Sequence, residues 1–83
     1  MFTIFHNSTR DGKYTIRLQM TGEEDIFPGT FMIFESTNGR LTGFANLGQK
    51  SPVDAVNEYN RRIDEYAKYD GIMFTQRLLT EAV

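Results

Sequence analysis

The sequence contains no cysteine and only one histidine. The lack of cysteine excludes disulfide bonds, thiolate zinc sites and a cysteine nucleophile. His6 has Ser8, Thr9 and Asp11 nearby in the chain, but these residues form no recognisable nucleophile motif. We therefore interpret His6 as an ordinary residue near a strand end, and we expect a protein that is not an enzyme and needs no cofactor.

Also missing is any apolar run that approaches the roughly 20 residues needed to span a bilayer. The segment Met1–His6 lacks the basic start and the long apolar stretch of a signal peptide. We therefore expect a cytoplasmic protein with no membrane association. The net charge of −2 gives no long-range attraction to nucleic acid, so it favours a protein partner, particularly one with a basic face.

The spacing of acidic residues that is typical of calcium loops is absent as well. Glu23, Glu24 and Asp25 are consecutive, whereas calcium loops place their oxygen ligands at alternate positions around a glycine. We therefore predict no metal site. The run is interpreted as a solvated acidic loop, with contact to a basic partner as its functional alternative.

Aromatic residues, by contrast, are abundant for the length of the chain. Of its 83 residues, 7 are Phe and 4 are Tyr. Each such ring buries about 150–250 Å² of surface in a core. The chain therefore has enough apolar material for one core without covalent staples, and we predict a single domain over residues 1–83.

Alternation and turn residues predict four strands. Residues 14–20 alternate apolar and polar side chains, which is typical of a strand with one buried and one exposed face. Residues 1–7, 30–37 and 40–47 are the other predicted strands. Asp11-Gly12 predicts a tight turn after the first strand, and Asn38-Gly39 predicts a two-residue type I′ hairpin turn between the last two.

The start of a helix is marked by Ser51 as N-cap, Pro52 at the first helical position and Asp54 three residues after the cap. We predict a helix from Pro52 to about Tyr69 that stops at Gly71. Residues 72–79 fit either a strand or a helix, and we favour a fifth strand. The predicted fold is α+β, with an antiparallel four- to five-stranded sheet built from two hairpins and one amphipathic helix on one face, in the order β-β-β-β-α-(β).

The Asn38-Gly39 turn also predicts which side chains share a face. If the register runs unbroken from the turn, Phe31, Ile33 and Phe44 lie together with Glu35 and Arg40. We expect this face to be open to solvent, where a charge is least costly, and an uncovered apolar cluster often marks an interaction site. The alternatives are that the C-terminal segment covers the cluster or that the two faces are exchanged. The predicted partner-binding residues are Phe31, Ile33, Phe44, Glu23, Glu24, Asp25, Glu35 and Arg40.

Three functions fit such a surface. In size, acidity and lack of a catalytic motif the chain resembles the small inhibitor proteins of bacteriophages, such as anti-CRISPR proteins. This resemblance implies a non-enzymatic role in protein–protein contact, as an inhibitor of host machinery or an adaptor. The second function is a binding module for single-stranded nucleic acid that uses Phe31, Phe44, Arg40 and Arg17. The third is a structural subunit of a homo-oligomer, such as a homodimer, whose sheets pair through the same cluster.

One strand also has a local resemblance to a nucleic-acid-binding family. Gly43-Phe44-Ala45, followed by Asn46-Leu47, resembles the third-strand signature of RNA-recognition motifs, in which an aromatic ring stacks on a base. That fold needs a helix between its first two strands, whereas this chain has the turn Ser8–Gly12 there. We therefore do not expect the RNA-recognition-motif fold.

Overall fold

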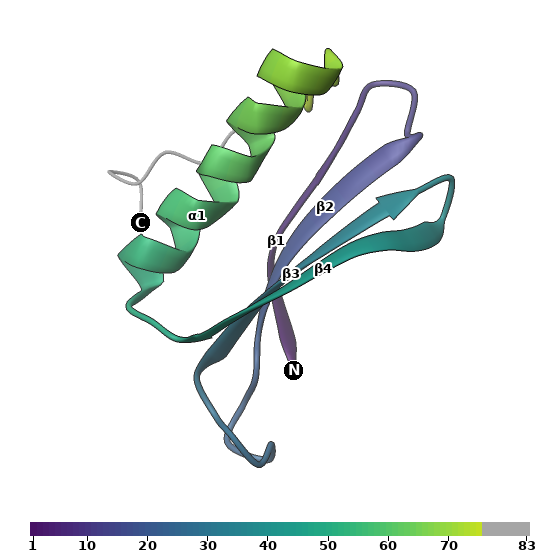
Figure 1. Ribbon diagram of the computed structural model, residues 1–83. Coiled ribbons are helices and arrows are strands. Elements are labelled where there is room, and N and C mark those ends of the chain that lie inside the picture. The colour runs from purple at the N-terminus through teal and green to yellow at the C-terminus, as the bar shows by residue number, and fades with distance from the viewer. Residues whose placement is uncertain (76–83) are drawn as a thin grey trace.

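Four strands form one antiparallel sheet, and a helix lies against one face of it (Figure 1). The computed structural model describes residues 1–75. Neighbouring strands in the sheet follow the order of the chain, so the sheet is a simple meander. The elements are β1 (Phe2–Ser8), β2 (Tyr14–Met20), β3 (Thr30–Thr37), β4 (Arg40–Gln49) and α1 (Pro52–Glu65). This arrangement confirms the predicted fold class and element order.

The predicted turns have the backbone geometry that their residues favour. Asn38 and Gly39 have φ angles of 53° and 79°, so the β3–β4 hairpin has the positive φ values of a type I′ turn. Gly12 has a φ of 75° in the turn between β1 and β2. These turns join consecutive strands tightly enough for antiparallel pairing.

Helix α1 begins where the capping residues predict. The Ser51 hydroxyl accepts a hydrogen bond from the Asp54 backbone N–H at 3.2 Å, and Pro52 occupies the first helical position. The helix runs to Glu65 and continues as one π-helical turn, η1 (Tyr66–Asp70). Gly71 then ends it in the left-handed conformation, with a φ of 68°. The predicted helical span and stop are therefore confirmed, although the last turn is wider than an α-helix.

The core lies between α1 and the sheet. Tyr59 is fully buried at its centre, and its hydroxyl donates a hydrogen bond to the Ile16 carbonyl at 3.1 Å. This bond satisfies the one polar atom that the ring brings into the core. The buried apolar cluster consists of Ile16, Leu18, Phe31, Ile33, Ala55, Val56, Tyr59 and Ile63.

After the helix the chain returns to β1. Phe74 forms an isolated antiparallel bridge with Thr9, and the Thr75 backbone N–H donates to the Ser8 carbonyl at 3.0 Å. Phe74 also packs against the core. The start of the predicted fifth strand is thus a single bridge, and its remainder, residues 76–79, lies outside the described residues.

The register of β3 and β4 departs from the unbroken register predicted from the turn. Thr37 pairs with Arg40 and Ser36 with Leu41, as predicted, but Glu35 then pairs with Gly43. Thr42 lies opposite no residue of β3 in the strand register, and a second irregularity leaves Leu47 without an opposite residue. Each extra residue is a β-bulge, and it exchanges the face of every residue that follows on β4.

The predicted face assignment is wrong for β3. Phe31 and Ile33 are 3% and 0% exposed and lie under α1, where Ile33 pairs beside Leu18 of β2. Glu35 lies on the same helix-covered face, and its carboxylate accepts hydrogen bonds from Tyr66 and Arg62. Its charge is therefore stabilised by direct partners rather than by water.

Candidate interaction surface

The sheet face opposite α1, here called the open face, is covered by no helix or strand of the described chain (Figure 1). Cross-strand pairing determines which side chains share it, because paired residues point to the same side. None of the residues that the register places on it is Asp or Glu. Its members are Thr3, His6, Ser8, Thr15, Arg17, Gln19, Thr30, Met32, Phe34, Ser36, Leu41, Phe44, Asn46 and Gln49.

A row of large side chains crosses the middle of the open face. Arg17 pairs with Phe34, and Phe34 pairs with Phe44, so one side chain from each of three strands stands in line. The Phe34 and Phe44 ring centroids are 5.1 Å apart and the rings are tilted by 54°. The Arg17 guanidinium carbon lies 5.4 Å from the Phe34 centroid, within cation–π range. Phe44 is nevertheless 55% exposed.

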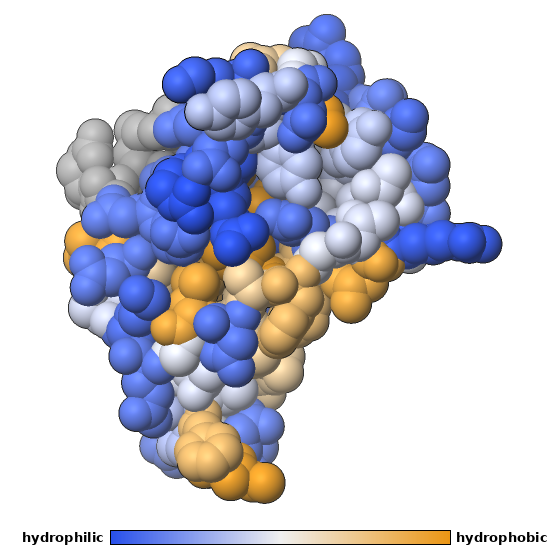
Figure 2. Space-filling view, viewed as in Figure 1, coloured by the Kyte–Doolittle hydropathy of each residue, from blue (hydrophilic) through white to orange (hydrophobic). Residues whose placement is uncertain are grey.

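A groove lies at one end of the open face, beside the loop that joins β2 and β3. It has a volume of about 550 Å³. Met32 and Asn46 contribute from the sheet, and Ile26 and Phe27 from the loop. Ile26 and Phe27 are 89% and 71% exposed, and Figure 2 shows this apolar surface as orange and tan atoms at the lower tip of the molecule.

Hydrogen bonds hold the β2–β3 loop in this exposed conformation. The Thr21 hydroxyl donates to the Phe27 carbonyl at 2.6 Å and accepts from the Thr30 backbone N–H at 2.9 Å. The Thr30 hydroxyl donates to the same Phe27 carbonyl at 2.9 Å. Because two hydroxyl groups hold the Phe27 carbonyl, the Phe27 ring is presented to solvent by a hydrogen-bonded loop.

The acidic run lies in the same loop. The carboxylates of Glu24 and Asp25 form ion pairs with the amino group of Met1, at N–O distances of 3.2 and 3.5 Å. The Asp25 carboxylate also accepts a hydrogen bond from the Gly22 backbone N–H at 2.7 Å. Hydrogen bonds from its own backbone and from the Met1 ammonium lower the pKa of the Glu24 carboxyl. The loop holds three carboxyl groups, Glu23, Glu24 and Asp25, against the one Met1 amino group, so this end of the sheet is acidic.

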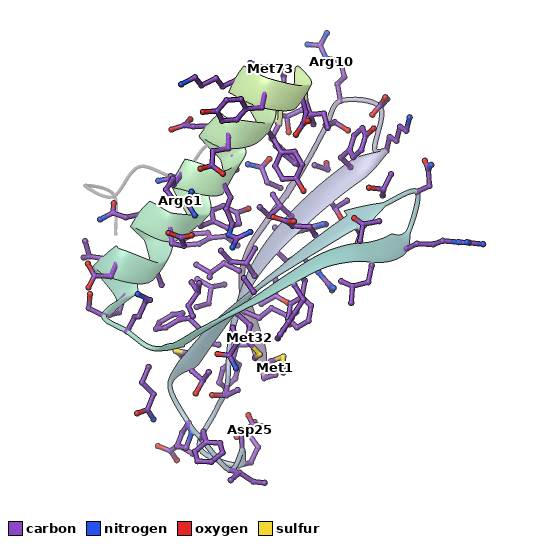
Figure 3. The ribbon with its side chains drawn as sticks, in the orientation of Figure 1. Met1, Arg10, Asp25, Met32, Arg61 and Met73 are labelled. Atoms are coloured by element: carbon purple, nitrogen blue, oxygen red, sulfur yellow. The ribbon has the colours of Figure 1, made fainter. Side chains whose placement is uncertain are left out.

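The opposite end of the sheet is basic, because three cationic residues there outnumber one carboxylate, Asp11. Arg10, Lys13 and Arg40 lie at the two hairpin turns, and the Asn38 backbone N–H donates to the Lys13 carbonyl at 2.7 Å, which ties the turns together. Figure 3 labels Arg10 and Asp25 at opposite ends of the molecule. Charge is therefore separated along the strand direction, which composition alone does not reveal.

A polar cluster lies on the helix side of the sheet and supports the fold. The Tyr66 hydroxyl donates to the Glu35 carboxylate at 2.9 Å, and Arg62 lies 3.3 Å from the same group. Burial, together with the Glu35 hydrogen bond, raises the pKa of Tyr66 to about 12. Glu35 also leans over Gly43, where any Cβ would overlap its carboxylate. The Glu35 carboxylate thus bonds to Arg62 and Tyr66 on the helix side of the sheet, so it is not part of the open face.

The structure therefore separates the residues predicted to bind a partner. Phe44 is exposed on the open face, as expected. Arg40, predicted to share that face, pairs with Thr37 and therefore lies on the helix side of the sheet, where it is exposed at the hairpin end. The bulge at Thr42 separates its face from that of Phe44. Phe31 and Ile33 belong to the core, and Glu35 belongs to the cluster with Arg62 and Tyr66. Glu23, Glu24 and Asp25 lie in the loop at the far end of the sheet from Arg40.

The surface also contains large side chains that the sequence analysis missed. Phe34 and Leu41 are not among the predicted partner-binding residues, yet both lie on the open face, and Leu41 is 59% exposed. Ile26 and Phe27 are also not among the predicted partner-binding residues. Two adjacent large apolar residues between an acidic run and a Pro-Gly turn could have indicated this surface, since neighbouring exposed apolar side chains often mark an interaction site.

Within residues 1–75, no group of three or more His, Cys, Asp or Glu side chains is arranged to hold a metal ion. Within the same range, no helix has the length and apolar character needed to cross a membrane. No protein-family model, curated protein or solved structure matches this chain. Its function therefore has to be inferred from the geometry of its surfaces.

Proposed function

We propose that this protein is a small, non-enzymatic binding module that docks a protein partner on its open sheet face. The observation that supports the proposal best is the presence of exposed apolar side chains on that face and in the loop beside it. Phe44 and Leu41 are 55% and 59% exposed on β4, and Ile26 and Phe27 are 89% and 71% exposed in the β2–β3 loop beside the groove. A stoichiometric inhibitor or adaptor needs such a surface and no catalytic group.

The composition of the open face suits protein binding. Aromatic residues and arginine are enriched at the energetic centres of protein interfaces, and the Arg17–Phe34–Phe44 row places both kinds together. The groove beside Met32 offers a concave site for a partner side chain. Polar groups such as Gln19 and Thr3, which already bond one another at 2.9 Å, surround the apolar row.

Affinity capture with matched variants tests this proposal. The tagged protein and its Phe44→Ala and Phe27→Ala variants are used to capture binding proteins from the native cell, followed by mass spectrometry. Asn57→Ala, which alters an exposed position on the outer side of α1, is the control. We expect both open-face variants to lose a protein that Asn57→Ala retains, each with a loss of about 2 kcal/mol or more if it removes a hot spot. Retention of every captured protein by both open-face variants would contradict the proposal.

A second candidate function is binding of single-stranded nucleic acid. It is favoured by one observation, that Arg17, Phe34 and Phe44 form a cationic and aromatic row on a face whose described members include no carboxylate. Stacking on such a row is worth about 1–3 kcal/mol per base. Fluorescence anisotropy with labelled oligonucleotides at low salt tests it. Salt-sensitive binding that Phe44→Ala and Arg17→Ala both weaken would support this candidate, and no binding at low salt would exclude it.

A further inference from the structure

The two ends of the sheet have opposite charge, and both carry exposed apolar residues. From this geometry we infer that the partner on the open face is a second copy of this chain, packed face to face with its strands antiparallel to those of the first. The inference rests on the proposed function, because it names the partner for the same surface. It depends on three features of the structure: charge, apolar shape and area.

The charges favour the antiparallel arrangement. Glu23, Glu24 and Asp25 lie in the β2–β3 loop at one end of the sheet. At the other end, Arg10, Lys13 and Arg40 outnumber the one carboxylate of the turns, Asp11, so this end has a net positive charge. A two-fold axis in the interface and perpendicular to the strands places the acidic end of each copy against the basic end of the other. A parallel arrangement would instead oppose like charges at both ends, at a cost.

The apolar residues match under the same axis. Such an axis reverses position along a strand but leaves each strand opposite its own copy, so β4 faces β4 and β3 faces β3. The groove beside Met32 and Asn46 then lies over the part of the partner's sheet that carries Leu41 and Phe44. Phe27 of each copy comes to the same region of the other. The most exposed apolar side chains of both ends are thereby buried together.

The surface is also large enough. The two longest dimensions of the molecule are 36 and 29 Å, and all four strands contribute side chains to the open face. A stable interface buries roughly 800 Å² per partner, which a face of this size can supply. Aligned packing of two sheets, with strand directions within about 30° of each other, is a common arrangement in proteins.

Charge reversal with rescue tests the arrangement. Sedimentation velocity gives the mass and the dimer dissociation constant of the wild type and of two double variants, Glu23→Lys with Glu24→Lys, and Arg10→Glu with Lys13→Glu. Each double variant leaves both ends with the same sign, so we expect about a tenfold or greater rise in the dissociation constant. Combining all four substitutions restores opposite ends, and we expect it to restore the dimer.

The matched control for Glu23→Lys with Glu24→Lys is Asp64→Lys with Glu65→Lys, which changes the net charge by the same amount and in the same direction on exposed positions of α1 and should leave the dimer intact. Thermal melts by circular dichroism establish that each variant is folded. A dimer that Phe44→Ala weakens but that the four-substitution variant fails to restore would overturn the antiparallel arrangement. A wild type that stays monomeric at its highest soluble concentration would overturn self-association altogether. In that case Phe44-dependent capture of a different protein would still support the proposed function. If no such protein were captured, both the self-association and the proposed function would be contradicted.

Discussion

Replacing Phe31 or Phe44 by alanine separates a core ring from a surface ring. Phe31 is 3% exposed in the cluster under α1, and truncation of a buried phenylalanine typically costs about 3–5 kcal/mol. Phe44 is 55% exposed, so less than half of its surface is buried and truncation removes less buried apolar area than at Phe31. Its ring contact with Phe34 is worth about 0.5–1.5 kcal/mol. We expect Phe44→Ala to cost about 1–2 kcal/mol in the free energy of unfolding.

Urea denaturation and thermal melts measure this difference directly. A domain of this size has a total stability of about 4–12 kcal/mol, so Phe31→Ala should remove a large part of it. For a small domain each kcal/mol lowers the melting temperature by roughly 4–8 °C. Phe31→Ala should therefore melt more than about 10 °C below the wild type, and Phe44→Ala well above Phe31→Ala. If Phe44→Ala proved as destabilising as Phe31→Ala, Phe44 would be a core residue and the open face would be wrongly assigned.

Three further predictions concern the cap, one glycine and a tyrosine. Ser51→Ala should lower the urea midpoint by an amount equivalent to about 0.5–2 kcal/mol, because it removes the hydrogen bond to the Asp54 N–H, and an unchanged midpoint would show that this cap contributes nothing. Gly43→Ala should be clearly destabilising in the same assay, since its Cβ would displace the Glu35 carboxylate, and a neutral effect would contradict that close approach. The pKa of Tyr66 is raised from 10.0 to about 12, so the folded state holds this proton more tightly than the unfolded state. Its contribution to stability is complete below about pH 10 and is lost as the pH rises towards 12, and Tyr66→Phe should remove that part of the pH dependence in melts.

Local signals in the sequence were sufficient to predict most of the fold. The Asn38-Gly39 turn adopts the positive φ values that these residues tolerate best, and Ser51 caps the helix as its position indicates. Both features depend only on residues adjacent in the chain. Period-two alternation likewise located β2 at Tyr14–Met20, because it needs only one buried and one exposed face.

The face assignment failed because it depends on interactions between distant residues. The turn determines the register only at Thr37–Arg40 and Ser36–Leu41, after which the bulge at Thr42 exchanges the faces of β4. The residues next to Thr42 in the sequence do not indicate a β-bulge. The choice of the covered face of β3 was also reversed, since the charge of Glu35 was expected to need water but is met by Arg62 and Tyr66. For Phe44 the two errors cancel, which is why its predicted exposure is confirmed while that of Phe31 is wrong.

The central claim, that the open face docks a protein, is tested most directly by site-specific photo-crosslinking. A photoreactive phenylalanine analogue is placed at position 44 on the open face, and in a separate variant at position 57 on the outer side of α1. Both variants are irradiated in the cells that make the protein, and adducts are identified by mass spectrometry. We expect a protein adduct from position 44, with a second copy of this chain as its main component, and none from position 57. Protein adducts from position 57 alone, or an adduct to nucleic acid alone at position 44, would contradict the claim.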